Sequence, residues 1–421
     1  MKKIIENGGL KLHLLKTEKY KTNTIVFKMK TPLTKENATI RALLPHVLQS
    51  GTNTYPSITE IRSYLEELYG AVLYVDLQKK GEYHVISITM ELANEKFLKS
   101  DEPLLEKGIT FLAELLLNPK TENNNSFDQQ IVEKEKRILK QRIQAAFDDK
   151  MRYANLRLIQ EMCKNEPYSV PVNGYLEDVD EITAQNLYSY YEKSIAEDEL
   201  DLFIVGDFDE NEVEALVREK LSFTERNPKY VSKAISHKVD KENVVIEKQD
   251  LAQGKLNIGL RTNIRYGDND YFALQVFNGL FGGFPHSKLF INVREKASLA
   301  YYAASRLESH KGLMMVMTGI ETKNYDRALT IIKEQLKEMK LGHFTEDELA
   351  QTKAMIQNQM METIDTSRGY IEVLYHNVIS QSNVTEELWK EKINEVKKED
   401  VIKVGEKIQL DTVYFLSGME A

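Results

Sequence analysis

Histidine and cysteine are the residues of this chain that could bind a transition metal. The chain has eight histidines and one cysteine, Cys163, so it can form neither an internal disulfide nor a cluster of thiolates. Neither an H-x-x-E-H nor an H-E-x-x-H sequence occurs. Several histidines lack a carboxylate or a second histidine at ligand spacing: His84, His237, His310 and His376. The residue types alone therefore indicate no complete metal site.

Arg294 and Tyr301 are candidates for binding carbonyl oxygens. A guanidinium offers donors in a fixed geometry, and a phenol donates a hydrogen bond without ionising at neutral pH. An apolar helix is predicted over 289–293 and the start of a strand over 299–304. A strand would point Tyr301 and Tyr302 to opposite faces, so only one of them can face a binding site. Alternatively, Arg294 pairs with a nearby carboxylate and Tyr301 lies in the core.

Gly279, Gly282 and Gly283 form a short glycine-rich stretch, for which the pattern predicts a loop. No G-K-[ST] sequence follows, so the stretch is not expected to hold a phosphate. The glycines could also do no more than end a helix.

The elements that must position these residues give a mixed α+β pattern. Residues 83–92 alternate as a half-buried antiparallel strand does, and 200–206 form an apolar run typical of a buried strand. Residues 126–164 contain neither proline nor glycine and carry apolar residues at helical spacing, which predicts one long helix. Ser126 and Gln129 would open it as a capping box.

The order of elements repeats at a period of about 210–230 residues. A strand at 23–29 leads to a helix at 40–51, and a strand at 255–261 leads to a helix at 271–282. Both halves close on a helix and then a strand: 187–194 with 201–206, and 401–408 with 412–418. We interpret this as a duplication, although any two α+β domains could share such a rhythm. The expected domains are 1–223 and 242–421, with a polar linker at 224–241.

Composition excludes several classes of protein. The chain has 421 residues, 42% of them hydrophobic and 29% charged, which is typical of globular domains. A formal net charge of −9 without a long basic cluster argues against nucleic acid as the partner. No apolar run approaches the roughly 18 residues that span a bilayer, so no membrane partner is expected. The amino terminus lacks an apolar signal core, and we expect a cytoplasmic protein.

Three stretches resemble the pitrilysin, insulinase and mitochondrial processing peptidase family, the inverzincins. Residues 42–52 (ALLPHVLQSGT) resemble the zinc helix H-F-L-E-H-x-L-x-x-G-T. Residues 166–174 (EPYSVPVNG), followed by 182–187 (ITAQNL) and 204–209 (IVGDFD), resemble the run H-P-Y…G…I-T…V-V-G-D-x-D. Residues 280–301 (LFGGFPHSKLFINVREKASLAY) are similar to L-G-G-G-x-S-S-R-L-F-x-x-L-R-E-K-x-G-L-A-Y. The resemblance implies two homologous halves, each an antiparallel sheet flanked by helices, that form half of a clamshell chamber.

The metal site is where the chain departs from this family. Alignment puts Ala42 at the first zinc histidine and Pro45 at the glutamate base, and keeps only His46. On the later ligand helix, Glu135 holds the place of the supporting glutamate, whereas Arg142 replaces the ligand. Alanine has no donor atom, and an arginine would repel a dication. The alternative interpretation, from the residues alone, is that His46 is an ordinary, partly buried histidine of a helix and that Glu135 and Arg142 form part of a polar seam on one helix face. The proline should kink the helix or delay its start.

The substrate-side residues of the family are kept. The resemblance implies that Arg294 and Tyr301 bind the substrate backbone and the oxyanion, and that the stretch with Gly279, Gly282 and Gly283 is a flexible loop near the peptide entrance. Of the two tyrosines, the family spacing favours Tyr301.

These implications together predict a zinc-less, non-catalytic subunit of a heterodimeric processing peptidase, with zinc only in a homologous partner that has an intact H-x-x-E-H motif. The substrate would be an extended peptide, and the chain could form a homodimer when it is alone. The alternative is a peptide-binding or assembly scaffold without a proteolytic role.

Overall fold

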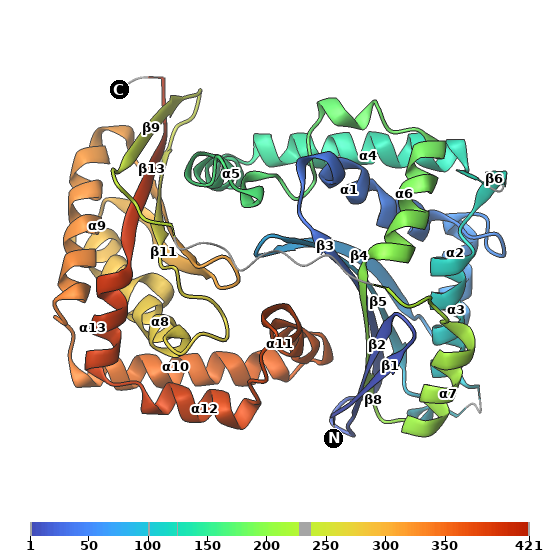
Figure 1. Ribbon diagram of the computed structural model, residues 1–421. Helices are drawn as coiled ribbons and strands as arrows, with labels where there is room; N and C mark the ends of the chain where they lie inside the picture. The colour runs from blue at the N-terminus through green and yellow to red at the C-terminus, as the bar shows by residue number, and fades with distance from the viewer. Residues whose placement is uncertain (1, 100–101, 124, 227–236, 420–421) are drawn as a thin grey trace. The chain divides into compact units, whose positions relative to one another are not determined.

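The computed structural model describes residues 2–99, 102–123, 125–226 and 237–419 (Figure 1). The chain forms two compact units, and each contains a segment from the other half of the sequence. The N-terminal unit comprises Met1–Ala145, Val170–Ser232 and Thr366–Glu372. The C-terminal unit comprises Ala146–Ser169, Lys233–Asp365 and Val373–Ala421. A division of the chain at one linker therefore does not account for the two exchanged segments, 146–169 and 366–372, each of which belongs to the unit of the other half. Within the expected linker at 224–241, residues 227–236 lie outside the described residues.

The N-terminal unit is built on a six-stranded sheet in the order β1-β2-β8-β3-β5-β4. Its strands are β1 (Lys2–Asn7), β2 (Leu10–Lys16), β3 (Thr22–Pro32), β4 (Val72–Lys80), β5 (Tyr83–Ala93) and β8 (Glu199–Gly206). All neighbouring pairs are antiparallel except β2 with β8, which are parallel. A small hairpin of β6 (Thr121–Asn123) and β7 (Ser126–Phe127) lies apart from this sheet.

The C-terminal unit has a five-stranded sheet in the order β11-β12-β10-β13-β9. Its strands are β9 (Asn243–Lys248), β10 (Gly254–Arg261), β11 (Ala300–Glu308), β12 (Leu313–Ile320) and β13 (Gln409–Ser417). Only β13 and β9 are parallel. Read from the β9 edge, this order matches β2-β8-β3-β5-β4, including the place of the parallel pair. The shared topology agrees with two homologous halves, and each sheet is mixed rather than wholly antiparallel.

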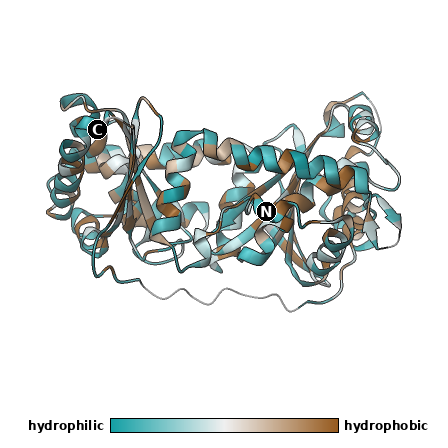
Figure 2. Cartoon of the chain, turned by 90° about the horizontal axis from the view of Figure 1, so that it is seen from above, coloured by the Kyte–Doolittle hydropathy of each residue, from teal (hydrophilic) through white to brown (hydrophobic). Residues whose placement is uncertain are grey.

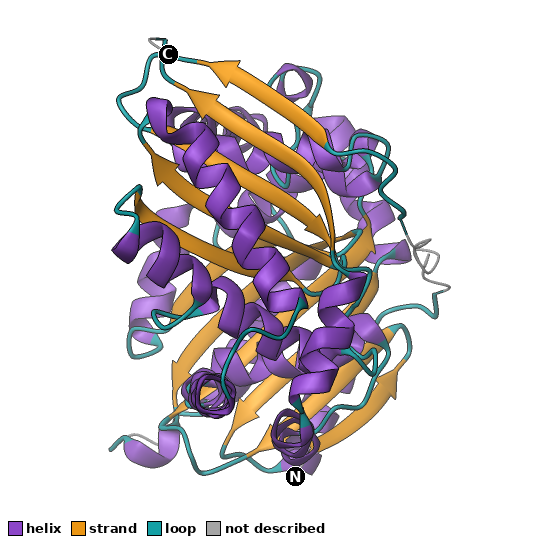
Figure 3. Ribbon diagram, turned by 90° about the vertical axis from the view of Figure 1, so that its left-hand side faces the viewer, coloured by secondary structure: helices purple, strands orange, loops and turns teal. Residues whose placement is uncertain are grey.

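Helices flank both sheets (Figures 1 and 3). Those of the first half are α1 (Lys35–Ser50), α2 (Ile58–Glu67), α3 (Leu104–Leu117), α4 (Gln129–Asp148), α5 (Lys150–Met162), α6 (Ala184–Glu197) and α7 (Glu210–Lys220). Those of the second half are α8 (Tyr271–Asn278), α9 (Tyr325–Lys340), α10 (Glu346–Ile364), α11 (Ser367–Ser380), α12 (Glu386–Glu395) and α13 (Lys398–Lys407). Two π-helical segments are η4 (Gly279–Gly283) and η5 (Phe290–Lys296). Short 3-10 turns are η1 (Glu95–Phe97), η2 (Pro167–Ser169), η3 (Glu177–Val179) and η6 (Thr322–Asn324). No helix in these described ranges has the length and apolar character needed to cross a bilayer.

The long helix predicted over 126–164 is two helices, because Asp149 interrupts it. The Asp149 carboxylate accepts hydrogen bonds from the backbone N–H groups of Met151 and Arg152, at 3.0 and 3.1 Å, and so caps α5. The predicted capping box at the start is also wrong. Asp128 caps α4, whereas the Ser126 hydroxyl donates to the carbonyl oxygen of Phe127. An acidic cap can occur within a charged, helix-forming run without a proline or glycine to mark it.

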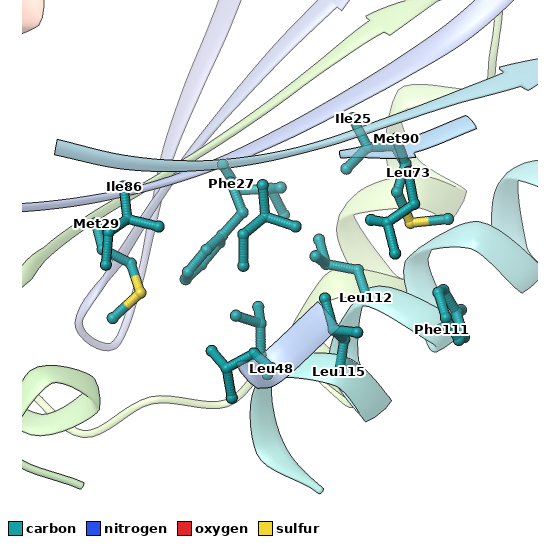
Figure 4. Close-up of a cluster of buried hydrophobic side chains, with 14 of the residues drawn as sticks. Ile25, Phe27, Met29, Leu48, Leu73, Ile86, Met90, Phe111, Leu112 and Leu115 are labelled. Carbon is teal, nitrogen blue, oxygen red and sulfur yellow. The ribbon is translucent and has the colours of Figure 1, made fainter. Parts of the chain in front are cut away.

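The core of the N-terminal unit lies between one face of its sheet and helices α1 and α3. Alternate residues of β3, Ile25, Phe27 and Met29, point into it, as strand periodicity requires (Figure 4). They meet Leu48 of α1 and Leu112 of α3, and all five side chains are fully buried. The hydropathy colouring shows the same division, with hydrophobic strands and largely hydrophilic outer helices (Figure 2).

The exchanged segment 146–169 is held in the C-terminal unit by packing and by charge. Helix α5 packs on β10 and β13, where a Cβ at Gly259 would lie 2.5 Å from the Met162 sulfur. The Glu166 carboxylate accepts from Arg261 at 2.6 Å and from Lys311 at 2.6 Å. Burial favours the protonated acid, but these two cations lower the pKa of Glu166 below its usual value. Glu166, the first residue of the E-P-Y stretch, therefore holds this segment against the sheet.

Candidate functional site: the degenerate metal position and the Arg294–Tyr301 region

Helix α1 carries the positions that align with the first two zinc ligands. The Thr34 hydroxyl caps it by accepting from the Asn37 backbone N–H at 3.3 Å, and the helix then continues to Ser50. The expectation that Pro45 delays the start of this helix is wrong, since Pro45 lies in its interior. Its missing N–H costs about 3 kcal/mol. Fully buried neighbours such as Leu44 offset this cost through their packing.

His46 and Arg142 form a direct hydrogen bond in the place where the family resemblance implies zinc ligands. The Arg142 Nη1 donates to the His46 Nε2 at 2.8 Å, and both side chains are partly buried. Burial and the adjacent guanidinium lower the pKa of His46 to about 4. The imidazole is therefore neutral at pH 7, and its lone pair is used by Arg142 rather than being free for a metal.

The other aligned residues are also engaged in the packing of α1 against α4. Ala42 is fully buried, and the Glu135 carboxylate accepts from the Ser50 hydroxyl at 2.9 Å. His46 and Ser50 lie one turn apart on α1, and each is bonded to a side chain of α4. The polar-seam interpretation of Glu135 and Arg142 thus agrees with the contacts, but the seam runs between two helices.

These donors do not fit a zinc ion. Zinc sites in proteins use three or four nitrogen, sulfur or carboxylate donors, and the aligned positions retain one imidazole beside a cation. Across the part of the chain that the structure describes, no three histidine, cysteine, aspartate or glutamate side chains are grouped to hold a metal ion. The aligned side chains therefore supply no ligand set for zinc chemistry at this position.

Arg294 lies on η5 and is exposed to solvent. Its guanidinium lies over the Phe290 ring, 4.4 Å from the centroid, and its Nε is 3.9 Å from the Glu295 carboxylate. A contact of 3.9 Å between exposed neighbours is a weak ion pair. The guanidinium donors are thus held against an aromatic ring and remain open to a ligand.

Tyr301 lies at the start of β11 with 79% of its surface exposed, so the interpretation of it as a core residue is wrong. The neighbouring Tyr302 is partly buried, and its ring packs where Gly319 leaves room, with the Lys255 ammonium 5.8 Å from the centroid. Burial raises the pKa of Tyr302 to about 12. The two tyrosines differ as strand alternation predicts, although the register against β12 shifts between Ala300 and Ala303. Segment η5 packs against β11, which places the two candidate residues on neighbouring elements.

The glycine-rich stretch is the π-helical segment η4 rather than a loop. A Cβ at Gly279 would lie 2.5 Å from the Thr352 methyl, and one at Gly282 would lie 2.6 Å from the Ser305 hydroxyl. Gly283 is exposed, and a Cβ there would lie 3.0 Å from Asn278. Two of the three glycines thus allow close packing of η4 against α10 and β11. The glycine pattern in the sequence cannot by itself distinguish such packing from a flexible turn.

The residue that sequence reasoning missed is Arg41, next to Ala42. Its side chain is fully buried, donates to the Met29 carbonyl oxygen at 2.8 Å and pairs with Asp198 at 2.7 Å. The sequence indicates Arg41 only as a charged residue on the apolar side of a helix. It lies outside the stretch that aligns with the zinc motif. The bond to Met29 fixes α1 to β3, and the pair with Asp198 fixes it to the end of α6, one residue before the aligned ligand position.

Comparison with known proteins agrees with the resemblance. Residues 181–356 match the family described as "Peptidase M16 inactive domain". The chain is 56% identical over 415 residues to the probable inactive metalloprotease YmfF of Bacillus subtilis, in a match that covers 99% of this chain and 97% of that protein. A conserved protein from Enterococcus faecalis V583 has a crystal structure that matches with a TM-score of 0.92 and 36% identity, over 100% of this chain and 99% of that one.

A more distant similarity is to the antilisterial bacteriocin subtilosin biosynthesis protein AlbE of Bacillus subtilis. The two are 27% identical over 134 residues, which is 32% of this chain and 33% of that protein. The long match to YmfF establishes the family. The chain belongs to the M16 peptidase family, as an inactive metalloprotease homologue.

Proposed function

We propose that this protein is the zinc-free subunit of a heterodimeric processing peptidase. The observation that carries the proposal is a contrast within the chain. The His46 lone pair is taken by Arg142, whereas Arg294 and Tyr301 remain exposed to solvent. A homologous subunit with an intact H-x-x-E-H motif would supply the zinc and the carboxylate that deprotonates water. This chain would supply donors for the substrate.

The roles of the two exposed residues follow from their chemistry. Arg294 would bind a carbonyl oxygen of the peptide backbone through its fork of N–H donors. The Tyr301 hydroxyl would donate to the oxyanion that forms when water attacks the scissile carbonyl. Neither role requires a metal in this chain. Both require that the partner's zinc and this surface meet in the complex.

The proposed substrate is an extended peptide, bound by strand addition to a sheet edge. The similarity to AlbE, whose name places it in the biosynthesis of a bacteriocin, supports a peptide substrate.

We propose a cytoplasmic location, since one buried cysteine, Cys163, requires no oxidising compartment. Neither nucleic acid nor membrane is a proposed partner, and a homodimer is proposed when the catalytic subunit is absent.

Reconstitution tests this proposal. The chain is purified alone and with the H-x-x-E-H homologue from the same genome, and zinc content and cleavage of an unfolded peptide are measured. We expect one zinc per heterodimer, bound to the partner, and full cleavage only by the mixture. Stoichiometric zinc and cleavage in the isolated chain would refute the proposal.

Two tyrosine variants then separate catalysis from scaffolding. Tyr301→Phe should lower kcat of the heterodimer by about 10²-fold, which is the usual cost of losing one oxyanion donor. Tyr302→Phe is the matched control, because it removes a hydroxyl from the adjacent, partly buried tyrosine. If neither variant changes turnover, the alternative function as a peptide-binding or assembly scaffold is favoured.

A further inference from the structure

Arg142 is a partly buried cation without a carboxylate partner in the described part of the chain. Its guanidinium forms no ion pair with an aspartate or glutamate of those ranges, and its hydrogen bond is to the uncharged acceptor His46. A guanidinium has five N–H donors. One donates to His46, so the others remain for another acceptor.

The carboxylates that act electrostatically on Arg142 and on His46, those of Glu135 and Asp76, are bonded to other groups. Glu135 lies two turns earlier on α4, and its carboxylate accepts from Ser50 at 2.9 Å and lies 3.4 Å from Lys134. Asp76 is exposed on β4 and accepts from the Leu77 backbone N–H at 2.8 Å and from the Gln78 side chain at 2.5 Å. Neither acid is positioned to neutralise Arg142 by direct contact.

The environment disfavours an uncompensated charge at this place. Burial lowers the pKa of Arg142 below its usual value, and nearby Glu135 opposes this only in part. The neutral His46 fixes one edge of the guanidinium by accepting a hydrogen bond at 2.8 Å. An oriented guanidinium with free donors and incomplete hydration binds an anion more strongly than a flexible surface arginine does.

We propose that Arg142, oriented by His46, forms a binding site for one carboxylate group of a peptide. A carboxylate accepts two parallel N–H bonds from a guanidinium and carries a single negative charge, which this single cation balances. A phosphate dianion would need a second cation. The carboxylate can be the free carboxyl terminus of a peptide or an aspartate or glutamate side chain. The site occupies the position that lost its zinc ligands, and it does not depend on a partner subunit.

Peptide titrations of the full chain, followed by NMR of arginine Nε–H groups, test this site directly. The probes are an acetylated hexapeptide with a free carboxyl terminus, the same peptide amidated, and the amidated peptide with one glutamate. We expect the free acid to shift the Arg142 signal and to bind at least about tenfold more tightly than the amide, as charge-assisted hydrogen bonds imply. Binding of the glutamate peptide would show that a side-chain carboxylate also serves.

Three variants complete the experiment. Arg142→Gln should abolish the preference for the acid, and Arg142→Lys should keep part of it because the charge remains without the fork. Arg137→Gln removes the same charge from an exposed position of the same helix and should bind as the parent chain does. If Arg142→Gln does not fold, the affinities of the parent chain for the acid and the amide, together with the Arg142 NMR signal, still test whether Arg142 binds a carboxylate.

The proposal is overturned if neither the free acid nor the glutamate peptide binds more tightly than the plain amide, if no peptide moves the Arg142 signal, or if Arg142→Gln keeps the preference for the carboxylate. Because no protease partner is present, failure here leaves the proposed heterodimer untouched, and failure of reconstitution leaves this site untouched.

Discussion

Arg142 and Arg294 occupy positions that the family resemblance singles out, yet their surroundings differ. Arg142 is partly buried and is hydrogen-bonded to His46 on the neighbouring helix. Arg294 is exposed, held over Phe290, and lies 3.9 Å from a neighbouring carboxylate. In the first region the aligned side chains make internal contacts, whereas in the second the guanidinium faces solvent. Under the proposed function, the solvent-facing donors would bind substrate although the aligned metal position holds no ligand set.

This contrast predicts that changes around α1 alter stability, whereas changes around η5 and β11 alter turnover.

Arg41→Met should lower the free energy of unfolding by about 3–5 kcal/mol, because it leaves the buried Asp198 carboxylate without its cation. Urea unfolding of the isolated chain measures the loss. The double variant Arg41→Met with Asp198→Leu is the control and should recover most of it, since both charges are then absent. A wild-type free energy of unfolding for the single variant would contradict the structural role of α1.

Arg294→Met should lower kcat/KM of the reconstituted heterodimer by about 10–150-fold, the range for hydrogen bonds to charged groups. The matched control is Arg306→Met, which removes a half-exposed arginine from β11 that lies 3.4 Å from Glu308. Steady-state cleavage of an unfolded peptide measures both. Equal losses in the two variants would indicate a general effect of charge rather than contact with substrate.

Acidification should destabilise the His46 region. The pKa of His46 is about 4 in the folded chain, against about 6.5 when unfolded, so the unfolded state takes up a proton first as the pH falls. The contribution of neutral His46 to the free energy of unfolding is full above about pH 6.5 and is lost as the pH falls to 4. Roughly 1–2 kcal/mol of the free energy of unfolding is lost between pH 7 and pH 5.

Urea unfolding at the two pH values checks this expectation. His46→Gln should show a smaller fall than the parent chain. Some fall should remain, because burial lowers the pKa of His84 to about 3 and acts in the same direction. An identical pH dependence in the variant would exclude a neutral, bonded His46.

Pro45→Ala should raise the free energy of unfolding by about 1 kcal/mol. Relief of an interior helix proline is worth up to about 3 kcal/mol, and lost burial and a freer unfolded chain offset much of it. Pro103→Ala, at the start of α3, is the control and should not stabilise. Thermal unfolding of both variants, followed by circular dichroism, would show whether the proline in α1 still limits stability.

Local patterns determined much of this fold. Strands 83–92 and 255–261 lie within β5 and β10, and the alternation of apolar residues in 83–92 follows from the strand period of two. The repeated order of elements indicated two related halves, and the sheets share one topology. The loss of ligand types at Ala42 and Arg142 could be read without coordinates, because alanine has no donor atom and arginine carries a positive charge.

Only the tertiary structure decided where the remaining polar groups find their partners. The hydrogen bond between His46 and Arg142 joins residues 96 positions apart, and no periodicity or cap signal encodes such a distance. The same holds for Glu166, which meets Arg261 because segment 146–169 belongs to the C-terminal unit. Backbone geometry makes secondary structure a local property of the sequence, whereas side-chain partners depend on how the sheets and helices pack.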